Sequence, residues 1–188
     1  WEFVRTIGDK EKMTNFLIKE IREIEKSCDI IVIVCNTAHS VIDEIKKEIK
    51  TPIIEIHKEV VKKIKKSIVK KVGVLGTALT LQSKLYFKEF EENGIKYEVL
   101  SALYESGLDR FSWNGIAKRI TPSKLKKIKE RFLKYVDFFK QQGCKGVLLG
   151  CTDYSFFISK KDVKGIKLFS STDILAEAVV DELKKDLE

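Results

Sequence analysis

The sequence lacks features that would place it in a membrane or in a secretory pathway. No apolar run approaches the roughly 20 residues that a membrane-spanning helix needs, and the longest, 30–35, has the length of a buried strand. The amino terminus, Trp1-Glu2-Phe3 followed by mixed charge, carries no secretory-signal pattern. We therefore expect a soluble, cytoplasmic protein without a membrane partner.

The sequence also has no Cys-x-x-Cys pair, which argues against a structural zinc site. Its two histidines, His39 and His57, do not stand at a metal-ligand spacing from the cysteines. With 44% hydrophobic and 34% charged residues, the chain is too long and too rich in core residues for a disulfide framework. We expect no metal, and a non-structural role for some of the cysteines stays open. The four cysteines are Cys28, Cys35, Cys144 and Cys151.

The formal net charge of +8 is of the kind that can attract nucleic acid. The lysines, however, lie mostly on the polar faces of predicted helices, as at 62–66 and 126–127, and they do not alternate with aromatic residues. Solvated helix faces account for this charge, and we expect no nucleic-acid partner.

Strand-like and helix-like segments alternate along the chain, which predicts an α/β fold with a mostly parallel sheet flanked by helices. The first strand-like segment is a continuous β-branched run, typical of a strand buried on both faces. The predicted strands are 29–34, 53–56, 72–75, 97–100, 146–149 and 166–169. The predicted helices are 11–26, 38–50, 58–69, 81–92, a long helix from Thr121-Pro122 to Gly143, and 173–186. The buried stripe of the long helix is predicted to be Leu125, Ile128, Phe132, Val136 and Phe139.

One short pattern occurs twice: an amphipathic helix, a cysteine, an apolar strand and a second cysteine. Ligands of open α/β sheets bind beyond the carboxyl ends of the strands, which is where Cys35 and Cys151 fall. Cys28 and Cys144 fall at the opposite ends, and we expect them to be ordinary buried thiols. Two unremarkable buried strand–helix units remain an alternative explanation of the repeat.

Two thiols at equivalent strand ends suit proton exchange at a stereocentre. One, as thiolate, would remove a Cα proton, and the other, as thiol, would return a proton to the opposite face. Donors around the substrate carboxylate would stabilise the carbanion as an enediolate. Because backbone N–H groups at such turns favour anions, we expect them to lower the pKa of both cysteines.

Three segments resemble the aspartate/glutamate racemase family. Residues 34–39 (Val-Cys-Asn-Thr-Ala-His) and 150–153 (Gly-Cys-Thr-Asp) are similar to its two signature motifs, and 76–80 (Gly-Thr-Ala-Leu-Thr) looks like its central segment. The resemblance covers nearly the whole chain in the right order and spacing. His39 favours the aspartate racemase branch, because glutamate racemases usually carry a small hydroxyl residue there.

The resemblance implies two similar α/β lobes, each with a mostly parallel sheet flanked by helices, related by a pseudo-twofold axis around the active site. The first lobe would comprise 1–70 plus 168–188, and the second 71–167. The implied activity is a cofactor-independent racemisation of aspartate, or else glutamate, with neither pyridoxal phosphate nor metal. Homodimers are common in the family, so we also expect a homodimer that binds a small acidic amino acid.

By the same resemblance, Cys35 and Cys151 are the two catalytic bases. His39 and Asp153 are candidates for tuning Cys35 and for orienting Cys151 or the substrate amine. Ordinary roles compete with these: helix-start packing or a backbone hydrogen bond for His39, and a helix cap for Asp153. His57 follows a strand and so could line the cleft, but a surface position is the favoured prediction for it. The residues implied to bind the substrate are Asn36, Thr37, Thr77, Thr80 and Thr152.

Three features depart from the family pattern. Asp153 stands where aspartate racemases usually have Glu and glutamate racemases have His, which leaves the substrate open. Residues 170–172 (Ser-Ser-Thr) replace a commoner Asp-Ser/Pro-Thr turn. The family's first strand and glycine-rich turn are missing before Trp1, so we expect an open sheet edge and an unfinished pocket in the first lobe. Two alternatives follow: a related enzyme acting on hydantoins, maleate or arylmalonates, and a non-catalytic remnant that binds acidic ligands or a partner.

Overall fold

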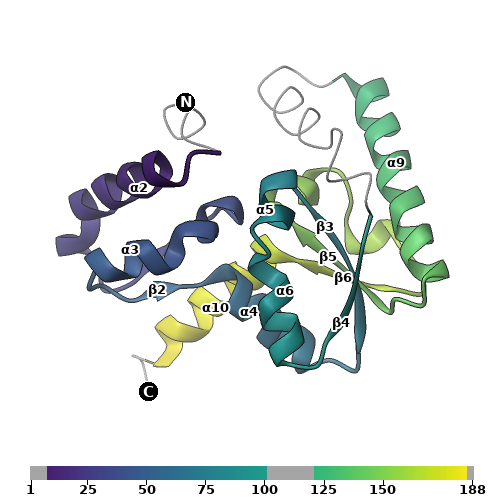
Figure 1. Ribbon diagram of the computed structural model, residues 1–188. Helices are drawn as coiled ribbons and strands as arrows, with labels where there is room; N and C mark the ends of the chain where they lie inside the picture. Colours follow the sequence, from purple (N-terminus) through teal and green to yellow (C-terminus); the bar gives the residue numbers. More distant parts are fainter. Residues whose placement is uncertain (1–7, 101–120, 186–188) are drawn as a thin grey trace.

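The computed structural model describes residues 8–100 and 121–185, which form two parallel sheets with helices around them (Figure 1). The smaller sheet pairs β1 (Ile31–Val32) with β2 (Ile53–Ile54). The larger sheet has the order β4-β3-β5-β6, and all of its neighbouring strands are parallel. The predicted α/β fold is confirmed. The strands of the larger sheet are β3 (Lys71–Gly76), β4 (Lys96–Val99), β5 (Gly146–Gly150) and β6 (Lys167–Ser170).

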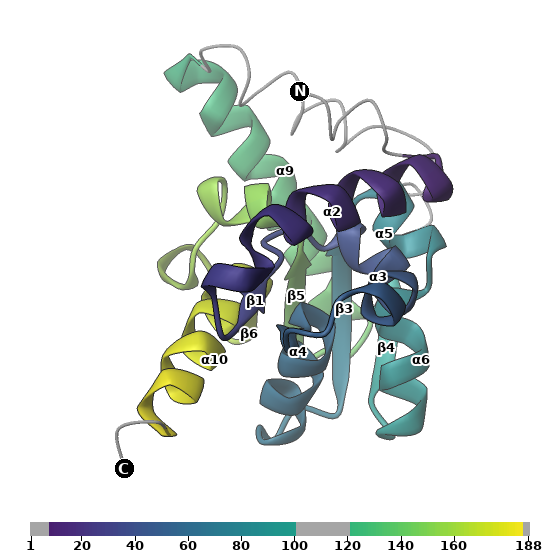
Figure 2. The ribbon, with the colours of Figure 1, turned by 90° about the vertical axis from the view of Figure 1, so that its left-hand side faces the viewer.

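Helices separate the strands along the chain and pack on both sheets. In Figure 1, α9 lies on one side of the larger sheet and α6 on the other, while α10 runs from β6 towards the smaller sheet. The view in Figure 2 shows α2 lying across α3 at the amino-terminal end of the described chain. The helices of the first part are α2 (Lys10–Ile24), η1 (Glu25–Ser27), η2 (Thr37–Val41), α3 (Ile42–Glu48) and α4 (Ile56–Lys65). Those that follow are α5 (Ala78–Gln82), α6 (Leu85–Glu92), α9 (Pro122–Gln141), η3 (Thr152–Phe156), η4 (Lys160–Asp162) and α10 (Ser171–Lys185).

The long helix α9 follows the sequence signals closely. Thr121 is its N-cap and accepts a hydrogen bond from the backbone N–H of Lys124, and Pro122 occupies the first turn, where it sacrifices no helical hydrogen bond. Four members of the predicted stripe are buried, but Leu125 is 40% exposed, so that part of the prediction is wrong. Leu125 lies in the first turn of α9, and among the described residues the buried stripe begins one turn later, at Ile128.

The first strand is shorter and more exposed than predicted. Only Ile31–Val32 of the predicted 29–34 pairs with β2. Ile31 and Ile33 are buried, whereas Val34 is 57% exposed, so the burial alternates instead of covering both faces. This is the pattern of a strand with one packed face, here against α2 and α3.

The single helix predicted over 81–92 is in fact two helices, α5 and α6. Lys84 lies between them with a φ of 57°, in the left-handed region that interrupts a right-handed helix. The Ser83 hydroxyl accepts a hydrogen bond from the Leu85 N–H and so compensates one of the donors that α6 leaves unpaired at its start.

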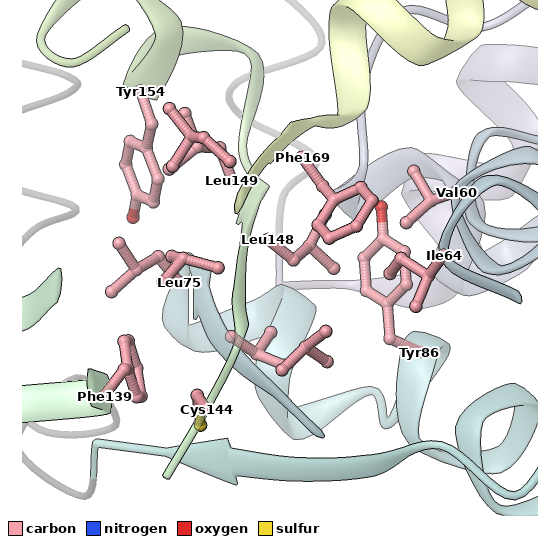
Figure 3. Close-up of a cluster of buried hydrophobic side chains, with 14 of the residues drawn as sticks. Val60, Ile64, Leu75, Tyr86, Phe139, Cys144, Leu148, Leu149, Tyr154 and Phe169 are labelled. Carbon is pink, nitrogen blue, oxygen red and sulfur yellow. The ribbon is translucent and has the colours of Figure 1, made fainter. Parts of the chain in front are cut away.

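The buried apolar side chains form two clusters. The larger surrounds β3, β5 and β6, and Figure 3 shows part of it, including Tyr86, Leu148 and Phe169. Val60 and Ile64 of α4 belong to this larger cluster, although the predicted first lobe extends to residue 70; that boundary remains a prediction. The smaller cluster consists of Met13, Ile21, Ile31, Ile33, Ala38, Val41, Ile42, Ile45 and Ile49.

Candidate active site

Two of the sequence motifs meet at the carboxyl edge of the larger sheet. Gly76 of β3 pairs with Gly150 of β5, so Thr77 and Cys151 follow at equivalent positions on neighbouring strands. Gly150 is needed for this close approach, because a Cβ there would lie 3.0 Å from the Leu75 carbonyl oxygen. The hydroxyl of Thr77 and the thiol of Cys151 therefore follow neighbouring strands at this edge. Ligands of open α/β sheets bind at such an edge, as expected from the sequence.

A cluster of three hydroxyl groups joins the first motif to the central one. The Oγ1 atom of Thr37, at the start of η2, lies 3.2 Å from that of Thr77 and 3.0 Å from that of Thr80. The Thr77 and Thr80 hydroxyls are 2.9 Å apart, and Thr77 also caps α5 by accepting from the Thr80 N–H. Each hydroxyl can donate once and accept twice, so this cluster retains lone pairs for a ligand. Three of the five predicted substrate-binding residues thus lie together.

Asn36 is held by two residues that sequence reasoning did not find. Its side chain is only 2% exposed; Oδ1 accepts a hydrogen bond from the Tyr86 hydroxyl, and Nδ2 donates to Ser171 Oγ over 3.0 Å. Tyr86 comes from α6 and Ser171 begins α10, so three separate elements meet at one amide. The Ser-Ser-Thr departure at 170–172 is the sequence signal that could have pointed to Ser171, whereas Tyr86 has the pattern of an ordinary core aromatic.

Cys35 lies half-buried directly before η2. Burial raises the pKa of its thiol, the backbone N–H groups of Ala38 and Thr37 lower it, and the charge of Asp153 raises it further. The prediction that the turn would lower this pKa is therefore wrong in its net direction, because the loss of water outweighs the two N–H groups. Because Asp153 belongs to the second cysteine motif, its effect on the pKa of Cys35 indicates that the two motifs lie near each other.

Cys151, Thr152 and Asp153 are all half-buried where β5 passes into η3. Burial raises the pKa of the Asp153 carboxyl, and Asp153 lies in the first turn of η3 without acting as its cap. Burial raises the pKa of Tyr86, a hydrogen bond with Ser171 lowers it, and the charge of Cys151 raises it. A Cβ at Gly150, the residue before Cys151, would lie 3.4 Å from Cε2 of the Tyr86 ring, so this turn lies close to the tyrosine that contacts Asn36. The substrate-binding role of Thr152 remains a prediction.

His39 contacts the backbone on both sides of its ring. Nδ1 lies 2.9 Å from the Cys35 carbonyl oxygen, and Nε2 accepts a hydrogen bond from the Ile56 N–H over 3.2 Å. These partners assign a neutral ring with its proton on Nδ1, and burial lowers the pKa of His39 in agreement. The backbone hydrogen bond considered for His39 is present, and it ties the ring to the residue that carries the thiol.

His57 is 5% exposed, so its predicted surface position is wrong. Its ring lies 5.7 Å from that of His39, and its Nε2 is 3.5 Å from Glu55 and 4.0 Å from Glu89. Burial, and then the neighbouring His39, lower the pKa of His57 to about 4. Within residues 8–100 and 121–185, no group of three or more His, Cys, Asp or Glu side chains is arranged to hold a metal ion.

The other two cysteines differ from each other. Cys144 is buried in the larger cluster, as predicted, whereas Cys28 is only partly buried at the edge of the smaller one. None of the four cysteines forms a disulfide within the described residues. Cys28 therefore offers an accessible thiol outside the hydroxyl and amide contacts described above.

Comparison with known proteins identifies the family. Residues 2–179 match the family model of Asp/Glu/Hydantoin racemase. The chain belongs to this racemase family. It is 32% identical over 173 residues to a glutamate racemase of Aquifex pyrophilus, covering 86% of this chain but 61% of that protein. A broad-specificity amino-acid racemase of Bacillus subtilis is 37% identical over 87 residues, which are 46% of this chain and 38% of that one. The chain therefore spans about three fifths of the curated glutamate racemase.

Solved structures of racemases share the fold. An aspartate racemase homologue from Pyrococcus horikoshii superimposes with a TM-score of 0.77 at 27% identity, over 96% of this chain and 78% of that one. The Aquifex pyrophilus glutamate racemase gives a TM-score of 0.63 at 25% identity, over 93% and 68%. The predicted two-lobe arrangement is consistent with these neighbours. Because both substrate names occur among the relatives, the aspartate branch remains a prediction.

No helix within the described ranges is long and apolar enough to cross a membrane.

Proposed function

We propose that this member of the racemase family interconverts the L and D forms of a small acidic amino acid, aspartate first and glutamate second, without pyridoxal phosphate. Cys35 and Cys151 are the two bases of the proposal. The hydroxyl cluster of Thr37, Thr77 and Thr80 supports it most directly, because it joins the segment after Cys35 to the strand edge that bears Cys151. A polar cluster between two thiol-bearing turns suits a substrate with charged groups around one Cα.

The proposed reaction balances in two proton transfers. The Cys35 thiolate removes the Cα proton and becomes a thiol, while the electron pair of the broken C–H bond moves into the substrate carboxylate as an enediolate. The Cys151 thiol then gives its proton to the opposite face of Cα and becomes a thiolate. In the reverse direction the two residues exchange roles. Hydrogen-bond donors around the carboxylate stabilise the enediolate more than the ground state.

The raised pKa of Cys35 fits this scheme only with help from the substrate. Burial keeps the thiol protonated at neutral pH, which disfavours the base form in the free protein. The α-ammonium group of a bound amino acid would oppose the negative charge of Asp153 and favour the thiolate. We therefore expect iodoacetamide to alkylate Cys35 faster as the pH is raised, without a plateau at neutral pH.

Cysteine substitutions test the proposal. Cys35→Ser and Cys151→Ser should each reduce racemisation of L-aspartate by about 10³-fold or more. A serine hydroxyl is a much weaker acid than a cysteine thiol, so at neutral pH it neither ionises to act as the base nor readily gives up its proton. Chiral chromatography of the product over time gives the rates. Cys28→Ser is the matched control and should retain activity within about twofold. Undiminished racemisation by either of the first two variants would contradict the two-thiol scheme.

A substrate panel separates the remaining alternatives. L-Aspartate, L-glutamate, maleate, a substituted hydantoin and an arylmalonate are incubated with the protein, and the products are identified by NMR. A product other than the enantiomer would favour an enzyme related to the hydantoin or maleate branch. Binding of aspartate in calorimetry without turnover would favour a non-catalytic acidic-ligand-binding protein. The predicted homodimer and cytoplasmic location stay predictions, and sedimentation velocity tests the first.

A further inference from the structure

Tyr86 is a buried residue of the larger cluster whose hydroxyl makes a polar contact with Asn36, outside that cluster. Its ring projects from α6 into the larger cluster near Val60 and Ile64, stacked on Phe90 with ring centroids 5.9 Å apart (Figure 3). Its side chain is 2% exposed, yet its hydroxyl donates to Oδ1 of Asn36. A fully buried phenol hydroxyl needs such a partner, and here the partner is a residue next to the proposed base Cys35.

The Asn36 amide has four hydrogen-bonding positions, and the structure accounts for two of them. Tyr86 uses one lone pair of Oδ1, and Ser171 accepts one of the two Nδ2 hydrogens. Among residues 8–100 and 121–185 the amide has no other side-chain partner, so one N–H and one lone pair remain for a ligand. Because the two contacts grip opposite ends of the amide, together they fix its rotation about the side-chain bond. With either contact removed, one anchor would remain and the amide could turn.

These contacts come from elements that carry both halves of the site. Asn36 follows Cys35, and Ser171 begins the helix after β6. Tyr86 lies in α6, and its ring is close to Gly150, the residue before Cys151. The amide therefore sits where α6, η2 and α10 converge. The orientation of the Asn36 amide therefore depends on contacts from α6 and α10, and residues 34–39 alone do not determine it.

We propose that Tyr86 is a positioning residue for the reaction: its hydroxyl, with Ser171, orients the Asn36 carboxamide so that the remaining N–H faces the substrate carboxylate. This inference rests on the proposed function, in which Asn36 binds substrate. It assigns Tyr86 no proton transfer and no contact with the substrate. Its effect on the reaction passes entirely through Asn36.

Removal of one oxygen atom tests this. Tyr86→Phe keeps the ring in the larger cluster and should lower kcat about 10-fold with a smaller change in KM, because the misoriented amide loses its contact with the developing enediolate. Tyr97→Phe is the matched control: the Tyr97 hydroxyl donates to Glu91 over 3.0 Å at an exposed site, and its loss should change kcat less than twofold. Ser171→Ala should resemble Tyr86→Phe.

A mutant cycle distinguishes positioning from general loosening of the fold. In the Asn36→Ala background, Tyr86→Phe should change kcat by less than twofold, because the group it positions is gone. A 10-fold loss in both backgrounds would overturn the inference, since the hydroxyl would then act independently of Asn36. Thermal unfolding of each variant checks that the compared proteins are folded at the assay temperature.

A final readout does not depend on turnover. In ¹⁵N-labelled protein, the Asn36 side-chain N–H signals, assigned by their disappearance in Asn36→Ala, should exchange with solvent about 10-fold faster in Tyr86→Phe than in wild type. Unchanged exchange would overturn the inference even in an active racemase. Wild-type protein that racemises nothing would overturn the proposed function, while the exchange measurement would still decide whether Tyr86 orients Asn36.

Discussion

The two sheets of this protein differ in how much structure supports each half of the candidate site. Cys151 and Thr77 follow five- and six-residue strands in the middle of a four-stranded sheet. Cys35 follows a strand that pairs over only two residues with one described neighbour. A long paired strand fixes the direction of the turn after it, whereas a short one leaves that turn to other contacts.

For the Cys35 half, some of those contacts come from elements that follow strands of the larger sheet. Thr37 bonds to Thr77 and Thr80, and Asn36 bonds to Tyr86 and Ser171. One half of the site is thus built by its own sheet, and the other is held against it by side-chain hydrogen bonds. We therefore expect destabilising substitutions near the smaller sheet to unfold the Cys35 half locally while the larger sheet stays folded.

A matched pair of core substitutions gives the largest expected effect. Ile64 and Ile45 are both fully buried helical isoleucines, one in each hydrophobic cluster. Each change to alanine should cost about 3 kcal/mol through lost burial and the cavity left behind. We expect Ile45→Ala to accelerate amide exchange around β1 and α3 while β3 and β5 stay protected, as measured by native-state hydrogen exchange. Equal loss of protection in both sheets would show that they unfold as one unit.

The buried His57 should make the free energy of unfolding depend on pH. Its pKa is lowered to about 4 in the folded protein, so below the ordinary value of 6.5 the unfolded chain takes up the proton first. Stability should therefore fall by up to about 3 kcal/mol as the pH drops from 6.5 to 4. Urea unfolding of wild type and His57→Gln across this range measures the effect.

The variant should show a shallower loss of stability in that window. Besides the neighbouring His39 ring, the ionisable groups that act on His57 are Glu55, Lys58 and Asp43, and Glu89 lies 4.0 Å away. Parallel pH curves for the two proteins would mean that His57 contributes no part of the acid sensitivity, and that the carboxylates around it account for all of it.

The hydroxyl cluster between the two halves gives the smallest expected effect on stability. Thr37→Val removes a hydroxyl that bonds to both Thr77 and Thr80, and it should cost about 1 to 2 kcal/mol in thermal or urea unfolding. The control, Thr14→Val, removes a hydroxyl that bonds to a backbone carbonyl on an exposed turn of α2, and it should change stability by less than about 0.5 kcal/mol. Equal effects would mean that the cluster does not join the halves.

Local sequence patterns predicted the parts of this protein that depend on local physics. Alternating strand and helix periods gave the α/β fold, and the Thr-Pro start of α9 gave a cap that the structure confirms. A buried strand followed by small polar residues marked the turns that carry Cys35 and Cys151. The cap of α9 and the strand and helix periods depend on residues a few positions apart, so a local pattern can report them.

The features that sequence reasoning missed depend on contacts far apart in the chain. Tyr86 has the helical spacing of a core aromatic, and only its bond to Asn36, 50 positions away, sets it apart. The burial of His57 results from packing against His39 and Glu89, and the raised pKa of Cys35 results from burial that no local pattern reports. Long-range packing decides each of these.

The fate of the Cα proton tests the central claim most directly. L-Aspartate is incubated with the protein in deuterated water, and both enantiomers are separated and analysed early in the reaction. Two thiols on opposite faces predict that newly formed D-aspartate carries deuterium at Cα while the recovered L-aspartate still carries hydrogen. Deuterium appearing in the recovered L-aspartate as fast as in the product would mean that one base serves both faces, and the two-thiol account would be wrong.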